Sequence, residues 1–232
     1  GKYYLFATLN SDIAWKAPMK NHPAFLHRTT QIFWADSPEG PFLPFESKLP
    51  HTPMGQMCLD GTLWVENGTP YMIYCHEWVE MMDGTMELVE LKPDLSGTVG
   101  QPIRLFCASA AEWSTGSLRE DGTRTYVTDG CFLYRTQTGK LLMIWSSFKN
   151  GEYAIGIAES MTGKVFGPWK QQKEPLFDKH GGHGMIFKTF DGRLCVVLHA
   201  PNSPGGAERA HIFEIEDLGH TLKLKDIILS NP

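Results

Sequence analysis

The heptapeptide Gly1-Lys-Tyr-Tyr-Leu-Phe-Ala decides the fold, because three later segments repeat its pattern. The copies are Gly68-Thr-Pro-Tyr-Met-Ile-Tyr, Gly139-Lys-Leu-Leu-Met-Ile-Trp and Gly192-Arg-Leu-Cys-Val-Val-Leu. A turn glycine followed by aromatic and β-branched residues is typical of a strand that leaves a hairpin. Four copies, spaced about 50 to 70 residues apart, indicate a repeat architecture built from similar units.

Each repeat reads as four antiparallel strands. In the third repeat these are residues 130–135, 140–147 and 153–160, followed by an outer edge that opens at Gly167-Pro-Trp. The first repeat ends at a similar corner, Gly40-Pro-Phe. Short strands at this spacing fit a radial propeller, whereas a β-sandwich would not produce four matched hairpins. The sequence predicts an all-β fold with five-bladed β-propeller architecture, as a single domain over residues 1–232 with about four blades present.

Three of the copies follow a strand that opens with a polar residue and glycine. These openings are Asp60-Gly61, Asp129-Gly130 and His183-Gly184, and the first copy has no such strand before it. We therefore expect the chain to comprise blades two to five, without an N-terminal blade.

Composition excludes several classes of partner. The net charge is −5, with acidic and basic residues interspersed, so neither a basic nucleic-acid groove nor a polybasic membrane surface is indicated. No run of about 18 apolar residues could span a bilayer. The five cysteines include no C-x-x-C pair, which disfavours structural zinc.

The repeat pattern places Asp60, Asp129 and His183 at equivalent positions of successive inner strands. Because inner strands line the central channel of a propeller, two carboxylates and an imidazole would converge on one cavity. Paired carboxyl groups are what glycoside hydrolysis requires, and their mutual repulsion keeps one of them protonated. The alternative is that each Asp-Gly is only a turn or cap.

These phrases resemble the five-bladed propeller glycoside hydrolases of family 43, which include α-L-arabinofuranosidases, β-xylosidases and arabinanases. The matching segments are Leu59-Asp-Gly-Thr-Leu-Trp-Val, Thr128-Asp-Gly-Cys-Phe-Leu-Tyr, Gly182-His-Gly-Met-Ile-Phe and Asp36-Ser-Pro-Glu-Gly-Pro-Phe, each in the family's order. The resemblance covers nearly the whole chain.

The resemblance implies three acidic residues. Asp60 matches the aspartate that orients the general acid and tunes its pKa, while nothing here matches the general base of the family's first blade. Asp129 stands where relatives carry a glutamate as general acid, and its side chain is one methylene shorter. Glu77, in Tyr74-Cys-His-Glu-Trp, is the alternative acid.

The resemblance also implies that His183 faces an axial metal, often calcium, although a hydrogen-bonded histidine without metal is the alternative. Calcium prefers six to eight oxygen ligands, so water would fill most of the shell around one imidazole. Trp15, His76 and Trp78 lie in segments expected beyond strand ends and are candidate platforms for a sugar ring.

We therefore expect a secreted or periplasmic glycoside hydrolase that acts on oligosaccharide or polysaccharide from plants, with no nucleic-acid or membrane partner. An exo-acting α-L-arabinofuranosidase or β-xylosidase is predicted, inactive or nearly so without its general base. The alternative is a non-catalytic glycan-binding propeller. A protein-interaction propeller is a weaker alternative, since no WD or kelch signature occurs.

Overall fold

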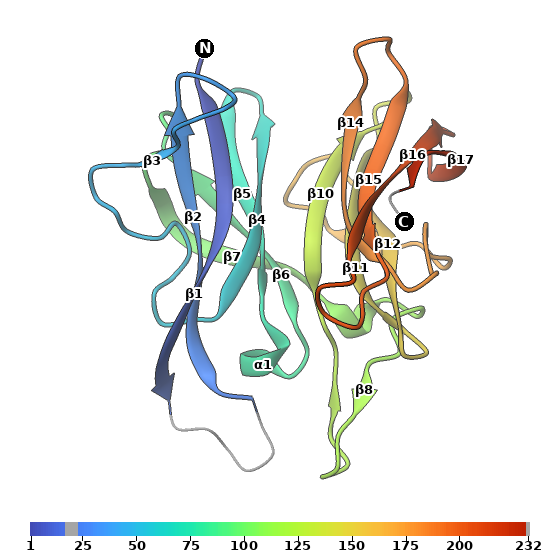
Figure 1. The fold of residues 1–232 in the computed structure, drawn as a ribbon, viewed down its shortest axis with the longest axis horizontal. Coiled ribbons are helices and arrows are strands. Elements are labelled where there is room, and N and C mark those ends of the chain that lie inside the picture. The colour runs from blue at the N-terminus through green and yellow to red at the C-terminus, as the bar shows by residue number, and fades with distance from the viewer. Residues whose placement is uncertain (17–22, 231–232) are drawn as a thin grey trace.

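The computed structural model describes residues 1–16 and 23–230. Four antiparallel sheets stand side by side around a common axis as four blades of a β-propeller, numbered here in chain order (Figure 1). The all-β architecture and the four blades expected from the repeats are confirmed.

Each blade is a meander of consecutive strands, because short hairpins join neighbouring strands. The first blade contains β1 (Tyr3–Lys16), β2 (Phe25–Ala35) and β3 (Leu43–Pro44). The second contains β4 (Cys58–Glu66), β5 (Thr69–His76), β6 (Thr85–Leu91) and β7 (Thr98–Cys107). The third contains β10 (Asp129–Arg135), β11 (Leu141–Lys149), β12 (Glu152–Ser160) and β13 (Trp169–Gln171). The fourth contains β14 (Gly182–Lys188), β15 (Leu194–Ala200), β16 (Arg209–Asp217) and β17 (Leu222–Ser230).

Short elements occupy one end of the propeller (Figure 1). Helix α1 (Trp78–Met81) follows β5, and the hairpin of β8 (Ser117–Leu118) with β9 (Arg124–Thr125) precedes the third blade. A single 3-10 turn, η1 (Ala108–Ala110), follows β7. No helix in the described part of the chain is long and apolar enough to cross a membrane.

The repeated heptapeptide forms β5, β11 and β15, the second strands of their blades, whereas in the first blade it forms β1. Within residues 1–16 and 23–230, the first sheet therefore has three strands and no equivalent of β4, β10 or β14. As a result β1 itself faces the axis, and Tyr3, Tyr4 and Leu5 are 44%, 38% and 45% exposed.

The apolar core lies between adjacent blades. Between the second and third blades the Trp113 and Trp145 rings pack with centroids 4.9 Å apart, and Trp145 is fully buried. The indole N–H of Trp145 donates to Gln171 Oε1 at 3.0 Å, so its polar atom is satisfied inside the core. Similar clusters join the first blade to the second and the third to the fourth.

This core leads to a test at Gly156, which pairs with Trp145 across β11 and β12. A Cβ atom at Gly156 would overlap the Trp113 ring, so Gly156→Ala must displace a buried indole. We expect Gly156→Ala to lower the free energy of unfolding by about 1–3 kcal/mol, as overpacked cores do. Urea denaturation measures it. Gly205→Ala is the control, because a Cβ there meets nothing within 4 Å. Equal midpoints for the two variants would refute this packing.

Candidate active site

A cavity of about 670 Å³ runs along the propeller axis. It is lined by β1, β4, β10 and β14, one strand from each blade. Asp60, Gly130 and His183 each contribute to its wall, whereas Asp129 does not.

The inner strands β4, β10 and β14 share an irregularity that explains why Asp129 does not line the cavity. In each of them two residues face one residue of the next strand, as in a β-bulge: Asp60 and Gly61, Gly130 and Cys131, and His183 and Gly184. The first residue of each pair has a positive φ, 57° at Asp60, 49° at Gly130 and 53° at His183. The structurally equivalent residues are therefore Asp60, Gly130 and His183.

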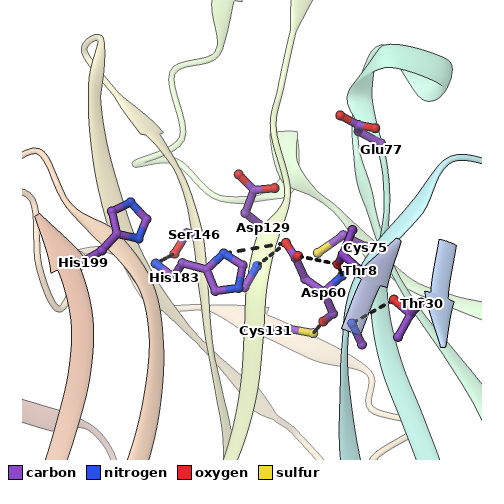
Figure 2. A network of polar contacts seen from close by, with 12 residues as sticks. Thr8, Thr30, Asp60, Cys75, Glu77, Asp129, Cys131, Ser146, His183 and His199 are labelled. Atoms are coloured by element: carbon purple, nitrogen blue, oxygen red, sulfur yellow. Dashed lines mark hydrogen bonds and ion pairs between the residues drawn. The ribbon is translucent and has the colours of Figure 1, made fainter. Parts of the chain in front are cut away.

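The prediction that Asp129 is equivalent to Asp60 and His183 is thus wrong by one residue. Asp129 precedes the bulge of its strand, where it pairs with Ser146. Successive side chains of a strand point to opposite faces, so a shift of one residue turns Asp129 away from the axial cavity. Figure 2 shows its carboxylate on the side of Asp60 where Glu77 and α1 lie.

Asp60 of β4 links its own blade to the other three at the axis (Figure 2). The Thr8 hydroxyl donates to Asp60 Oδ1 at 3.2 Å, and the backbone N–H of Asp60 donates to the same hydroxyl oxygen at 3.0 Å. Asp60 Oδ2 accepts the backbone N–H of Gly130 at 3.2 Å and lies 3.8 Å from His183 Nδ1. These partners from β1, β10 and β14 fix the orientation of the carboxylate.

Gly130 packs against the His183 ring, and the space there admits only a glycine. A Cβ on Gly130 would come within 2.7 Å of the His183 ring, so any larger residue would push the imidazole out of place. The backbone N–H of His183 donates to Ser146 Oγ at 2.8 Å, which anchors the fourth blade to the third.

Asp129 has the properties of a carboxylic acid that stays protonated. Burial raises its pKa well above the ordinary value, and the neighbouring Asp60 and Glu77 carboxylates raise it further. The Tyr153 hydroxyl donates to Asp129 Oδ2 at 2.9 Å, which opposes this rise and fixes the direction of the side chain. Such an environment suits a proton donor.

Glu77 directly follows β5 and is 6% exposed. Burial raises its pKa, although its ion pair with Arg28 of β2 favours the charged form. Its Oε1 meets the guanidinium, while Oε2 has no hydrogen-bond partner among the described residues. The structure therefore brings Asp60, Asp129 and Glu77 into one electrostatically interacting group.

The three predicted sugar platforms differ in position. Trp78 is partly buried and lines a groove of about 900 Å³ together with the β8–β9 hairpin. Trp15 lies in β1, and its side chain falls outside the described part of the structure. His76 is 4% exposed with both ring nitrogens bonded to carboxylates, so the expectation that it stacks on a sugar is wrong.

The residues around His183 do not form a metal cage. Within residues 1–16 and 23–230, no three His, Cys, Asp or Glu side chains converge to hold a metal ion. The rings of His183 and His199 lie with their centroids 6.5 Å apart. With one imidazole beside one carboxylate, water would supply most of the oxygen ligands that calcium requires, so the axial calcium stays a prediction.

Sequence reasoning missed the residues that hold these carboxyl groups and His183 in place. Thr8, Arg28, Ser146 and Tyr153 all reach the site from a neighbouring strand or blade. The sequence held a signal only for the position of Asp129. The third and fourth hairpins are one residue longer than the second, counted from the first bulge residue to the turn glycine: Gly130 to Gly139, His183 to Gly192 and Asp60 to Gly68.

Comparison with known proteins identifies the family. The family model for glycosyl hydrolases family 43 matches residues 1–216. The chain belongs to glycoside hydrolase family 43. The recognition made from the sequence is confirmed, and the protein is a glycosidase that acts on carbohydrate.

Solved structures of the family share this fold. An endo-arabinase from Bacteroides thetaiotaomicron VPI-5482 is 43% identical, with a TM-score of 0.80 over 93% of this chain and 72% of that one. A thermostable family-43 glycoside hydrolase is 23% identical, with a TM-score of 0.78 over 100% of this chain and 73% of that one. An α-L-arabinanase from Cellvibrio cellulosa, complexed with arabinohexaose, is 14% identical, with a TM-score of 0.62 over 97% and 74%. The latter two show the fold alone, and a search of curated proteins returned no match.

The carboxyl group of Asp129 gives a direct test of the site's electrostatics. We expect Asp60→Asn to lower the pKa of Asp129, because it removes a negative charge that disfavours ionisation. Carbon-13 NMR titration of labelled aspartate carboxyls measures the change. Asp36→Asn is the control, since the Asp36 side chain is 76% exposed and bonded to Lys2. An unchanged Asp129 titration in Asp60→Asn would contradict the proposed coupling.

Proposed function

We propose that this family 43 glycosidase hydrolyses α-L-arabinofuranosidic linkages in arabinan-like chains, with Asp129 as the proton donor. The observation that carries the assignment of the donor is the partly buried Asp129 carboxyl, which Tyr153 orients and whose pKa is raised by desolvation and by the neighbouring Asp60. The choice of sugar is supported by the 43% identity to a chain named as an endo-arabinase.

The reaction needs a proton at the glycosidic oxygen as the bond to the anomeric carbon breaks. Protonated Asp129 donates that proton and becomes a carboxylate, and the sugar beyond the broken bond departs as an alcohol. Water adds to the anomeric carbon and loses its own proton to a base. Asp60, fixed by Thr8 and Gly130, holds a negative charge near Asp129 and keeps its proton on until substrate arrives. We assign no described residue as the base, so we expect turnover by this chain to be slow, in line with the prediction from the sequence.

Glu77 is the alternative donor. It is buried beside the same group, and its pKa is also raised by burial. Its contact with Arg28 stabilises the ionised form, which is the wrong state for a general acid. We therefore propose Asp129 as the acid and Glu77 as a charged neighbour that supports its protonation.

A groove beside Trp78 supports internal cleavage of the chain, which we propose. Exo action and β-xylosidase activity remain predictions from the sequence, while the groove lined by Trp78 and the β8–β9 hairpin leaves room for several sugar units. Since such polysaccharides lie outside the cell, we propose a secreted or periplasmic location.

A second candidate is a glycan-binding propeller that does not cleave its ligand. It is favoured by aspartate at position 129, where the sequence resemblance implies glutamate. The shorter side chain withdraws the carboxyl by roughly 1 Å, and a displacement of that size can lower the rate about 100-fold.

Products released from debranched arabinan, arabino-oligosaccharides and xylan test the proposal. We expect oligosaccharides from arabinan and at least a 100-fold loss of kcat in Asp129→Asn, because general acid catalysis contributes about 10²–10⁴-fold. Glu77→Gln separates the alternative donor, and Asp191→Asn, in an exposed turn, is the control.

Each other outcome has a meaning. Arabinose as the sole product indicates exo action, and turnover of xylan alone refutes the proposed linkage. Arabino-oligosaccharide binding by calorimetry without any turnover supports the glycan-binding candidate. Activity that survives Asp129→Asn but not Glu77→Gln transfers the role of acid to Glu77.

A further inference from the structure

The segment that carries Glu77 and Trp78 has little regular structure of its own. Helix α1 is a single four-residue turn, and helices this short are not stable by themselves. Its N-cap residue, Glu77, makes no side-chain capping bond. The direction in which this segment presents its side chains must therefore come from contacts with the rest of the protein.

His76 supplies such contacts. Its Nε2 lies 2.9 Å from Glu80 Oε2 on α1, and its Nδ1 lies 3.2 Å from Glu87 Oε1 on β6. Neutral imidazole has one donor, whereas imidazolium has two, so two carboxylate partners select the charged form. The ring thus joins the helix to the sheet at a position that is 4% exposed.

Both carboxylates are held on their other sides as well. Glu80 Oε2 accepts the backbone N–H of Met57 at 2.8 Å. Glu87 accepts the Thr85 hydroxyl at 3.1 Å and the Tyr74 hydroxyl at 3.1 Å. Because both carboxylates have further hydrogen-bond partners, the network ties His76 to three separate segments of the second blade.

The position of Glu77 follows from this network. It is flanked by His76 and one helical turn from Glu80, and its backbone N–H donates to Met57 O at 2.8 Å. Trp78 packs against the small cluster of Phe25, Met57 and Val79, at the edge of the groove.

We propose that His76 is a positioning residue: bonded to Glu80 and Glu87 at once, its ring holds α1 against β6 and so fixes where Glu77 and Trp78 lie. It touches no substrate and acts through these two neighbours. We call the contacts of His76 with Glu80 and Glu87 the clamp. The effect of the clamp on catalysis rests on the proposed function, whereas the clamp itself does not.

The charge of His76 supports this assignment. Burial alone would lower its pKa, but hydrogen bonds and attraction from Glu80 and Glu87 outweigh burial and raise the pKa to about 9. Burial would likewise raise the pKa of Glu87, but the contact with His76 lowers it.

Other titratable groups face the same network from neighbouring strands. Cys58 of β4 pairs with His76, and burial followed by the nearby glutamates raises its thiol pKa above its ordinary value. Burial and the nearby Cys58 and Glu87 raise the pKa of Tyr74 in the same way. Both groups stay neutral over the range in which His76 titrates, and Arg28 stays charged beside Glu77.

The sign of the pH dependence is therefore fixed by His76. Its pKa is higher in the folded state than in the unfolded chain, so its contribution to stability is complete below about pH 6.5 and is lost as the pH rises through about 9. The clamp is intact at neutral pH and opens under alkaline conditions.

His76→Gln tests the clamp, because glutamine keeps one donor but cannot carry charge. We expect amide-exchange protection of residues 77–82 to fall at least 10-fold at pH 7, and arabino-oligosaccharide binding to weaken by a similar factor. In the wild type the same protection should fall between pH 8 and 10, and NMR of labelled histidine should show one imidazole that titrates near pH 9.

His51→Gln is the matched control. His51 is also 4% exposed and makes two hydrogen bonds, with the backbone N–H of Ile32 and the carbonyl of Leu95, but it contacts no carboxylate there. We expect it to reduce overall stability without a selective effect on residues 77–82. Glu80→Gln is a second variant if His76→Gln fails to fold, and it should lower the titration point of His76.

The results separate the clamp from the proposed function. Unchanged protection of residues 77–82 in His76→Gln, or a His76 that titrates near pH 6.5, overturns the clamp. Lost protection with unaltered kcat, KM and pH profile overturns its positioning role. A wild type that neither binds nor cleaves arabino-oligosaccharides refutes the proposed function, while the exchange and NMR results still decide the clamp.

Discussion

The Asp60 carboxylate is the interaction on which the centre of this propeller depends. Adjacent blades pack through apolar clusters, but their inner strands converge at the axis, so one side chain there can bond to several blades at once. Asp60 accepts bonds from Thr8 in the first blade and Gly130 in the third, and faces His183 of the fourth. A residue at the heart of the candidate active site thus also sets the geometry of the fold around it.

The repeated bulge decides which groups face the axis and which face Glu77 and α1. Asp60, Gly130 and His183 occupy its first position, and Gly130 must be small because the His183 ring fills the space beside it. Asp129 stands one residue earlier and points the other way, toward Glu77 (Figure 2). One structural irregularity therefore separates an axial cluster from the proposed proton donor.

The sequence predicted the blades because their strands are encoded locally, in turn glycines and short apolar runs such as Gly139-Lys-Leu-Leu-Met-Ile-Trp. It misplaced Asp129 because the Asp-Gly phrases at Asp60 and Asp129 look alike, although the third hairpin is one residue longer than the second. It predicted a sugar platform at His76 because it expected β5 to end earlier. Instead β5 continues through His76 into the interior, where the ring bonds to Glu80 and Glu87. Tyr153 and Arg28 act across strands and blades, which no spacing along the chain reveals.

The crowding of carboxyl groups around Asp129 has a consequence for how the protein can change. An acid whose pKa is raised by folding makes the folded state less stable at neutral pH than a side chain of the same shape that does not ionise. Substitutions that remove the ionisable group are therefore favoured by selection for stability and opposed by selection for turnover. A member of the family that is no longer under selection for turnover would be expected to become a more stable propeller that binds sugar without cleaving it.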